Sequence, residues 1–295
     1  MSVNDEEYRR LVEEAGLPPE AQPSARFFGK GAEHEVDRAL AAAAAGDDAA
    51  YAAAVARAVE RLHALGLDGK TGNDIQARRA AEVAAGTAEP LKIGVLISGS
   101  GTNLQALIDC IAAGTLNAKI VMVISSRPSA AGLKRAADAG IQTLALSKEL
   151  YAEDPWVADE VIATELMHAG AEYIVMAGYM RKIHEPLLAL WPNRVVNLHP
   201  ALLPSFQGAH GIADAYARGV KVTGVTVHFA NEVYDQGPII AQEPVRVEEG
   251  WSVDDLETAI HATEHRLYPQ VVQLLAEGRV HVRDDLTVEV APAAV

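Results

Sequence analysis

The sequence predicts an α/β fold in which a doubly wound, mostly parallel sheet carries helices on both faces, preceded by a small all-helical N-terminal extension. Three observations predict this fold. From residue 91 onward, short apolar runs alternate with segments of helical periodicity, which is typical of a parallel sheet with crossover helices. The runs are nearly continuous, as expected of strands buried on both faces. Composition also changes near residue 90, which separates the extension from the rest.

The N-terminal extension is rich in Ala, Glu and Arg, and residues 1–89 are expected to form short helices. A capping-box pattern predicts a first helix over 4–16, and a second is expected over about 47–65. Residues 85–90 are predicted to be a linker to a larger domain over 90–295. We expect the extension to mediate homodimer formation or partner contact. An extension without a function of its own fits the sequence equally well.

The larger domain is expected to alternate strands and helices in its first half. Predicted strands cover 92–98, 119–125, 141–146, 173–177 and 195–198. Predicted helices cover 103–113, 130–139, 157–169 and 185–190. After Pro200 the pattern changes to a helix near 209–218, a strand pair over 223–230 and 239–247, and a helix over 253–277 that closes the domain.

Bulk composition excludes several classes of protein. The net charge of −15 argues against a broad nucleic-acid surface, and we expect no nucleic-acid partner. No apolar run is long enough to cross a membrane, and the acidic N-terminus does not resemble a signal peptide. The single cysteine, Cys110, precludes an intrachain disulfide. Histidines form no tight metal-binding spacing, so no metal is expected. These features predict a cytoplasmic protein.

The most informative motif lies at the end of the 195–198 strand. Asn197 and His199 are two residues apart and should face the same side of the sheet. An amide can donate to an oxygen that gains charge, and an imidazole can carry a proton at neutral pH. Asp235, in a turn-like run, is a plausible ionic partner for His199. His228, within the 223–230 strand, is interpreted as structural. These residues suggest an acyl-transfer site.

A glycine-rich loop, 98–103, follows the first predicted strand and opens a helix. It lacks the complete dinucleotide fingerprint and the lysine of a Walker loop. Free N–H groups at a helix start attract anions, so the loop suits a single phosphate. An ordinary tight turn between strand and helix remains an alternative.

Together these motifs resemble the phosphoribosylglycinamide formyltransferase family, the folate-dependent enzymes of purine biosynthesis and one-carbon metabolism. The resemblance covers about 91–285 and rests on the segments 97–105, 177–181, 197–204 and 235–238. It implies a Rossmann-like formyltransferase fold, transfer of a formyl group from the co-substrate 10-formyltetrahydrofolate to glycinamide ribonucleotide, and Asn197, His199 and Asp235 as the catalytic residues. The residues that the resemblance assigns to the ribonucleotide are Gly101, Thr102, Asn103, His261, Ala262, Thr263 and Glu264. Those assigned to the folate are Met180, Arg181, Lys182, Ile183, Asn197, Asn231, Glu232, Val233, Tyr234 and Asp235.

The chain departs from the family pattern at two places. About 90 residues precede its first predicted strand, and Pro155 stands where some members carry an arginine near the folate tail. Other readings include a 10-formyltetrahydrofolate hydrolase, which would not need the phosphate loop, and methionyl-tRNA formyltransferase, which needs a basic RNA-binding domain. A non-catalytic folate or nucleotide sensor is the alternative from a different class.

Overall fold

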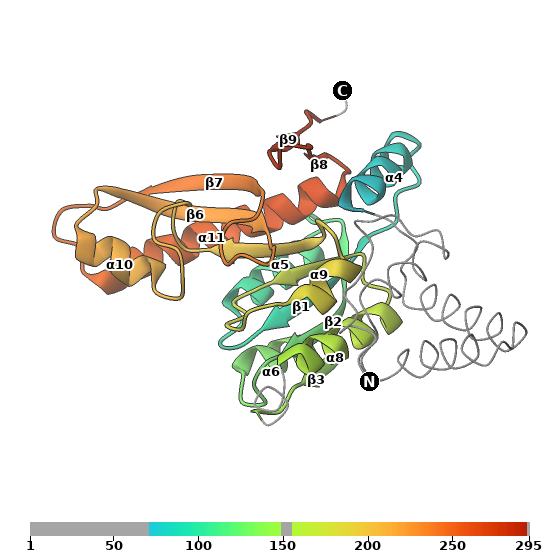
Figure 1. The fold of residues 1–295 in the computed structure, drawn as a ribbon, viewed down its shortest axis with the longest axis horizontal. Helices are drawn as coiled ribbons and strands as arrows, with labels where there is room; N and C mark the ends of the chain where they lie inside the picture. Colours follow the sequence, from blue (N-terminus) through green and yellow to red (C-terminus); the bar gives the residue numbers. More distant parts are fainter. Residues whose placement is uncertain (1–70, 149–154, 294–295) are drawn as a thin grey trace, which may run out of the picture.

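The computed structural model describes residues 71–148 and 155–293, and its centre is a seven-stranded sheet (Figure 1). The strands are β1 (Leu91–Ile97), β2 (Ala118–Ser125), β3 (Thr143–Ala145), β4 (Tyr173–Met176), β5 (Val195–His199), β6 (Val222–Phe229) and β7 (Ile239–Arg246). Their order is β3-β2-β1-β4-β5-β6-β7. Strands β1 to β5 pair in parallel, whereas β6 pairs antiparallel with both β5 and β7. The predicted mostly parallel sheet is confirmed. The helices predicted over 4–16 and 47–65 lie outside the described residues.

Helices cover both faces of the sheet, as the sequence predicts. They are α4 (Gly72–Ala84), α5 (Thr102–Ala112), α6 (Ala131–Asp138), α8 (Pro155–His168), α9 (Glu185–Leu190), α10 (Gly211–Arg218) and α11 (Val253–Ala276). One core cluster joins β1 to α5, α6 and α11, and a second joins the opposite face to α8 and α9. Within β1, Val95 belongs to the first cluster and Leu96 to the second. Burial of both faces explains why this strand is a continuous apolar run.

Helix α4 packs against the larger domain, beside the C-terminal end of α11 (Figure 1). The Gln76 amide donates to the Tyr173 hydroxyl and accepts from the Val280 N–H. Arg79, which is 1% exposed, donates to the carbonyl oxygens of Ala276 and Glu89. Because buried polar groups must find partners, these contacts fix the helix on the domain. Helix α4, which lies within the predicted extension over 1–89, is therefore packed on the larger domain.

The last helix does not close the domain, so that prediction is wrong. Strands β8 (Val280–Val282) and β9 (Val288–Val290) follow α11 and form an antiparallel pair. Each strand is only 3 residues long, which is too short to produce a recognisable alternation. Helix α11 itself begins with a capping box at Ser252 and Asp255.

The topology brings several loops to one edge of the sheet. The chain passes from β1 outward to β2 and β3 on one side, and then returns from β3 to β4 on the other side of β1, which creates a switch point where ligands commonly bind. The loop after β1, the segment after β4 and the end of β5 all lie at this edge. The Tyr268 hydroxyl on α11 lies 3.1 Å and 3.0 Å from the carbonyl oxygens of Met176 and Val196, and so ties the helix to β4 and β5.

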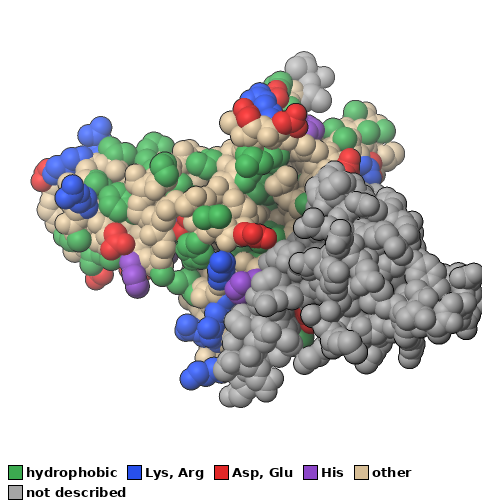
Figure 2. All heavy atoms as spheres, in the orientation of Figure 1, with side chains coloured by type: hydrophobic (Ala, Val, Ile, Leu, Met, Phe, Trp, Pro, Cys, Tyr) green, Lys and Arg blue, Asp and Glu red, His purple; other side chains and the backbone are tan. Residues whose placement is uncertain are grey.

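The surface is mixed in charge. On the face seen in Figure 2, Lys and Arg side chains lie in separate groups with acidic side chains between them. In the described part of the chain, no helix is long and apolar enough to cross a membrane.

Candidate active site

The amide of Asn197 has a fixed orientation because it contacts His228. Asn197 lies on β5 opposite His228 of β6, and its Nδ2 is 3.1 Å from Nε2 of the histidine. The other ring nitrogen, Nδ1, donates to the Phe229 carbonyl at 2.8 Å, so Nε2 must be the acceptor. Burial lowers the pKa of His228, which keeps the ring neutral. One amide hydrogen therefore faces His228, and the other is available to a ligand. The interpretation of His228 as merely structural missed this contact.

The carboxylate of Asp235 lies between two imidazoles. Its Oδ2 accepts the Gly208 N–H at 2.8 Å and lies 3.4 Å from Nδ1 of His199. Its Oδ1 is 3.8 Å from Nε2 of His228. The residue is 5% exposed, and its φ of 56° is a left-handed conformation that the surrounding contacts hold in place. The ionic pairing of His199 with Asp235, predicted from sequence, is present.

His199 lies two residues after Asn197 on β5, and its ring is covered by the chain that follows the strand. Its Nε2 bonds the Phe206 carbonyl oxygen at 2.8 Å, and the residue is 3% exposed. The chain folds back after Pro200 and brings that carbonyl over the ring, an effect that residue spacing along a strand does not reveal. Both ring nitrogens face oxygen acceptors, and only the doubly protonated ring offers a donor to each.

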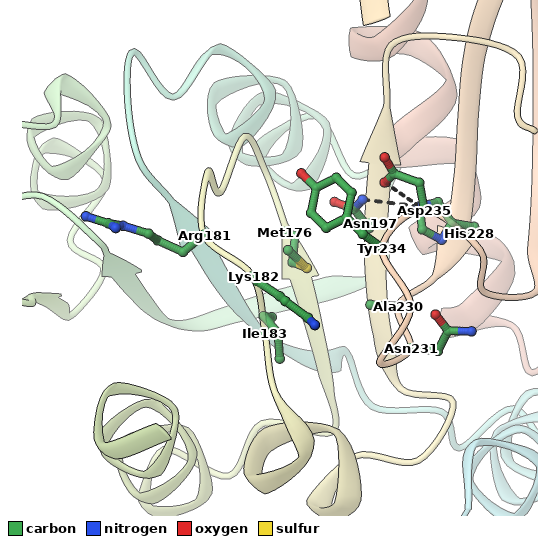
Figure 3. Close-up of a pocket in the computed structure, with 10 residues that line it drawn as sticks. All are labelled: Met176, Arg181, Lys182, Ile183, Asn197, His228, Ala230, Asn231, Tyr234 and Asp235. Atoms are coloured by element: carbon green, nitrogen blue, oxygen red, sulfur yellow. Dashed lines mark hydrogen bonds and ion pairs between the residues drawn. The ribbon is translucent and has the colours of Figure 1, made fainter. Parts of the chain in front are cut away.

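A pocket opens beside Asn197 and Asp235 (Figure 3). It is lined by Met176, Arg181, Lys182, Ile183, Asn197, His228, Ala230, Asn231, Tyr234 and Asp235. Seven of these were predicted to bind folate, whereas Met176, His228 and Ala230 were not. Three predicted residues, Met180, Glu232 and Val233, are exposed and do not line the pocket. Figure 3 shows that Arg181 points away from the other labelled side chains.

The glycine-rich loop ends at the start of α5, where the first-turn N–H groups lack a side-chain cap. Gly101 has a φ of 71°, and a Cβ there would lie 2.6 Å from the Gly132 Cα. The glycine is thus needed for a left-handed turn and for close packing against α6. Asn103, in the first turn of α5, is 9% exposed and its Nδ2 donates to Oε2 of Glu264 at 3.0 Å. The Asn103 Oδ1 is buried without a hydrogen-bond partner among the described residues.

The α11 segment predicted to contact the ribonucleotide meets this loop through one carboxylate. Glu264 Oε2 also lies 2.9 Å from Nδ1 of His261, and this hydrogen bond raises the pKa of His261. Thr263 instead donates to the Ala259 carbonyl on its own helix, and Ala262 is exposed. Of the four predicted α11 residues, Glu264 therefore contacts Asn103 of the loop and His261 contacts Glu264.

His265 was not among the residues that the sequence analysis assigned to a site. It lines a second hollow together with Thr102 and Arg135. Its Nε2 is buried without a partner in the described structure. The signal that could have found it is its position, one residue after Glu264 on a helix facing the loop.

No group of three or more His, Cys, Asp or Glu side chains is placed to hold a metal within residues 71–148 and 155–293. The arrangement offers instead an oriented amide, a histidine paired with a carboxylate, and an uncapped helix start at the same sheet edge. Such groups can stabilise an oxyanion, carry a proton and bind a phosphate.

Known proteins share this architecture. Residues 91–272 match the family model described as formyl transferase. A glycinamide ribonucleotide transformylase from Symbiobacterium toebii, of known structure, is 43% identical, with a TM-score of 0.66 and coverage of 69% of this chain and 95% of that one. The chain belongs to the phosphoribosylglycinamide formyltransferase family. Members of this family are transferases that use 10-formyltetrahydrofolate as co-substrate.

Two further relatives mark the limits of the family likeness. A trifunctional purine biosynthetic protein from Gallus gallus is 41% identical over 192 residues, which are 65% of this chain but 19% of that protein. The chain thus spans about a fifth of this relative. A formyltetrahydrofolate deformylase from Pseudomonas syringae is 25% identical, with a TM-score of 0.65 and coverage of 74% of this chain and 76% of that one.

Proposed function

We propose that this phosphoribosylglycinamide formyltransferase homologue transfers the formyl group of 10-formyltetrahydrofolate to the amine of N1-(5-phosphoribosyl)glycinamide. The products are N2-formyl-glycinamide ribonucleotide and tetrahydrofolate, within purine biosynthesis. One observation carries this proposal: the oriented Asn197 amide and the Asp235 carboxylate form one wall of a pocket at the switch point of the sheet.

The reaction proceeds without a covalent enzyme intermediate. The amine attacks the formyl carbon, and the free Nδ2 hydrogen of Asn197 donates to the oxyanion of the tetrahedral intermediate. One such donor contributes about 3–4 kcal/mol to the transition state. His199 supplies the second donor once its Nε2 exchanges the Phe206 carbonyl for the substrate oxygen. Asp235 orients His199 and passes the amine proton, through water, to the departing folate nitrogen. Holding both substrates at one sheet edge lowers the entropic barrier.

The ribonucleotide is expected at the start of α5. Its phosphate would meet the uncapped N–H groups of Gly101, Thr102 and Asn103, because the helix terminus favours an anion. Glu264 accepts a hydrogen bond from Asn103 and would accept further hydrogen bonds from the hydroxyl groups of the ribose. His265, on the hollow beside Thr102, offers a further donor to the phosphate.

The folate is expected between the segments 180–183 and 231–235. Ile183 and Tyr234 supply apolar surface, and Lys182 supplies a cation for the glutamyl carboxylates. We further propose that the N-terminal extension, residues 1–89, serves assembly or partner contact, and that the protein is cytoplasmic.

The rival reading is a hydrolase, favoured by the likeness to the deformylase. If water accepted the formyl group, the uncapped start of α5 and the hydrogen-bonded residues Asn103, His261 and Glu264 would have no role. The test follows release of the folate product from 10-formyltetrahydrofolate with and without glycinamide ribonucleotide. Release that requires the ribonucleotide supports transfer. Equal release without it would establish the hydrolase, and ligand binding without any release would establish the sensor.

A further inference from the structure

One wall of the folate pocket has no regular secondary structure, yet it is held at both ends. The wall segment, residues 180–183, connects the end of β4 to the start of α9. At its first residue, the Met180 N–H donates to the Ser98 hydroxyl at 2.8 Å. That hydroxyl is 2.6 Å from the hydroxyl of Ser126, and both serines are buried. The N-terminal end of the segment is therefore fixed to the loops that follow β1 and β2.

The other end of the wall segment is fixed by a buried carboxylate. Oδ2 of Asp159, on α8, accepts the backbone N–H of His184 at 2.6 Å and lies 3.0 Å from its Nδ1. The Asp159 side chain is 2% exposed, whereas that of His184 is 20% exposed. His184 directly follows Ile183, which lines the pocket, and is the N-cap residue of α9.

A buried carboxylate is costly unless its oxygens are well bonded. Burial raises the pKa of Asp159, and the hydrogen bonds from His184 oppose that rise. An apolar residue would pack α8 against α9 without this cost, so the carboxylate requires another explanation. Both hydrogen bonds of Asp159 are made to His184, the residue that directly follows the wall segment.

We propose that Asp159 and His184 are positioning residues for the folate pocket, because their buried pair fixes the C-terminal end of the wall segment. The proposal rests on the folate assignment of this pocket made above. A wall held at both ends binds its ligand without first losing conformational entropy. The pair touches neither substrate, so it should affect the capture of folate rather than the chemical step.

The test compares KM with kcat for two variants. His184→Ala removes the ring donor, and Asp159→Asn removes the charge while keeping one acceptor oxygen. Each should raise KM for 10-formyltetrahydrofolate about tenfold, as expected when one or two wall residues regain backbone freedom. The kcat and the KM for glycinamide ribonucleotide should change less than about threefold, because the pair contacts no reacting atom. His184→Asn places an amide donor near the position of Nδ1 and should restore the folate KM.

A matched control separates positioning from stability. Ser252→Ala removes a cap at the start of α11, where the Ser252 hydroxyl accepts the Asp255 N–H. It should lower Tm without changing either KM. If His184→Ala and Asp159→Asn behave like this control, with lower Tm and unchanged folate KM, the pair serves helix packing alone and the proposal is overturned.

The outcome is distinguishable from failure of the proposed function. If the wild-type protein proves to be a hydrolase, the same folate KM is read from hydrolysis. If it shows no turnover, the Kd for folic acid, measured by isothermal titration, takes the place of KM. In each case a Kd or KM that the two variants leave unchanged contradicts the positioning role.

Discussion

Replacing Asp235 with asparagine removes the charge that lies between His199 and His228. Its Oδ2 is 3.4 Å from Nδ1 of His199 and both side chains are buried. At an effective dielectric constant of about 20, unit charges at that distance attract by about 5 kcal/mol. Desolvation offsets a part of this attraction. A contact that stabilises developing charge contributes about 3–4 kcal/mol, and 1.36 kcal/mol corresponds to tenfold in rate. We therefore expect kcat to fall at least about a hundredfold.

The structure also predicts what Asp235→Asn leaves intact. The asparagine oxygen can still accept the Gly208 N–H, so the loop keeps its anchor. The residues of α5 and α11 that are expected to bind the ribonucleotide are Asn103, His261 and Glu264, and Asp235 takes no part in their hydrogen bonds. The assay measures kcat for formyl transfer and, separately, the Kd for glycinamide ribonucleotide, which should stay within about twofold. A kcat within about threefold of wild type, in a variant with unchanged Tm, would refute the role given to Asp235.

Three other predictions concern stability. Because burial lowers the folded-state pKa of His228 below its ordinary value of 6.5, the ring contributes stability that is present above pH 6.5 and lost as pH falls through the lowered pKa. The free energy of unfolding is measured with urea at pH 5–8 for wild type and for His228→Gln. The difference between the two should be constant at high pH and decline at acid pH. A difference that does not vary with pH contradicts this prediction. Gly237→Ala places a Cβ 1.8 Å from the Phe229 carbonyl oxygen and should lower the free energy of unfolding by at least about 1–3 kcal/mol, and an unchanged urea midpoint would show the turn to be adaptable. A chain truncated to 91–295 loses α4 and should melt at least about 5 °C lower than one truncated to 71–295; equal melting of the two would show that the contacts of α4 contribute little.

The sequence predicted the elements whose patterns are local. The continuous apolar run of β1 and the helix predicted over 253–277 both match the structure. Asn197 and Asp235 were selected from residue type and sequence context, and their catalytic role stays a prediction.

What the sequence missed depends on partners distant in the chain. The role of His228 follows from its register opposite Asn197, which no periodicity encodes, and from the carbonyl of the next residue, Phe229, in the same strand. Strand alternation placed His199 on the same face as Asn197, but it did not reveal that the returning chain places the Phe206 carbonyl on the imidazole ring. Strands β8 and β9 are too short for a pattern, and the attachment of α4 depends on two buried polar side chains, Gln76 and Arg79.

The most direct test of direct formyl transfer follows the carbon itself. The wild-type protein is given 10-formyltetrahydrofolate labelled with ¹³C in the formyl group, together with glycinamide ribonucleotide, and the label is followed by NMR. We predict that the label moves into the amide of the formylated ribonucleotide and that no free formate forms. Appearance of the label as formate, with the ribonucleotide unchanged, would contradict the account.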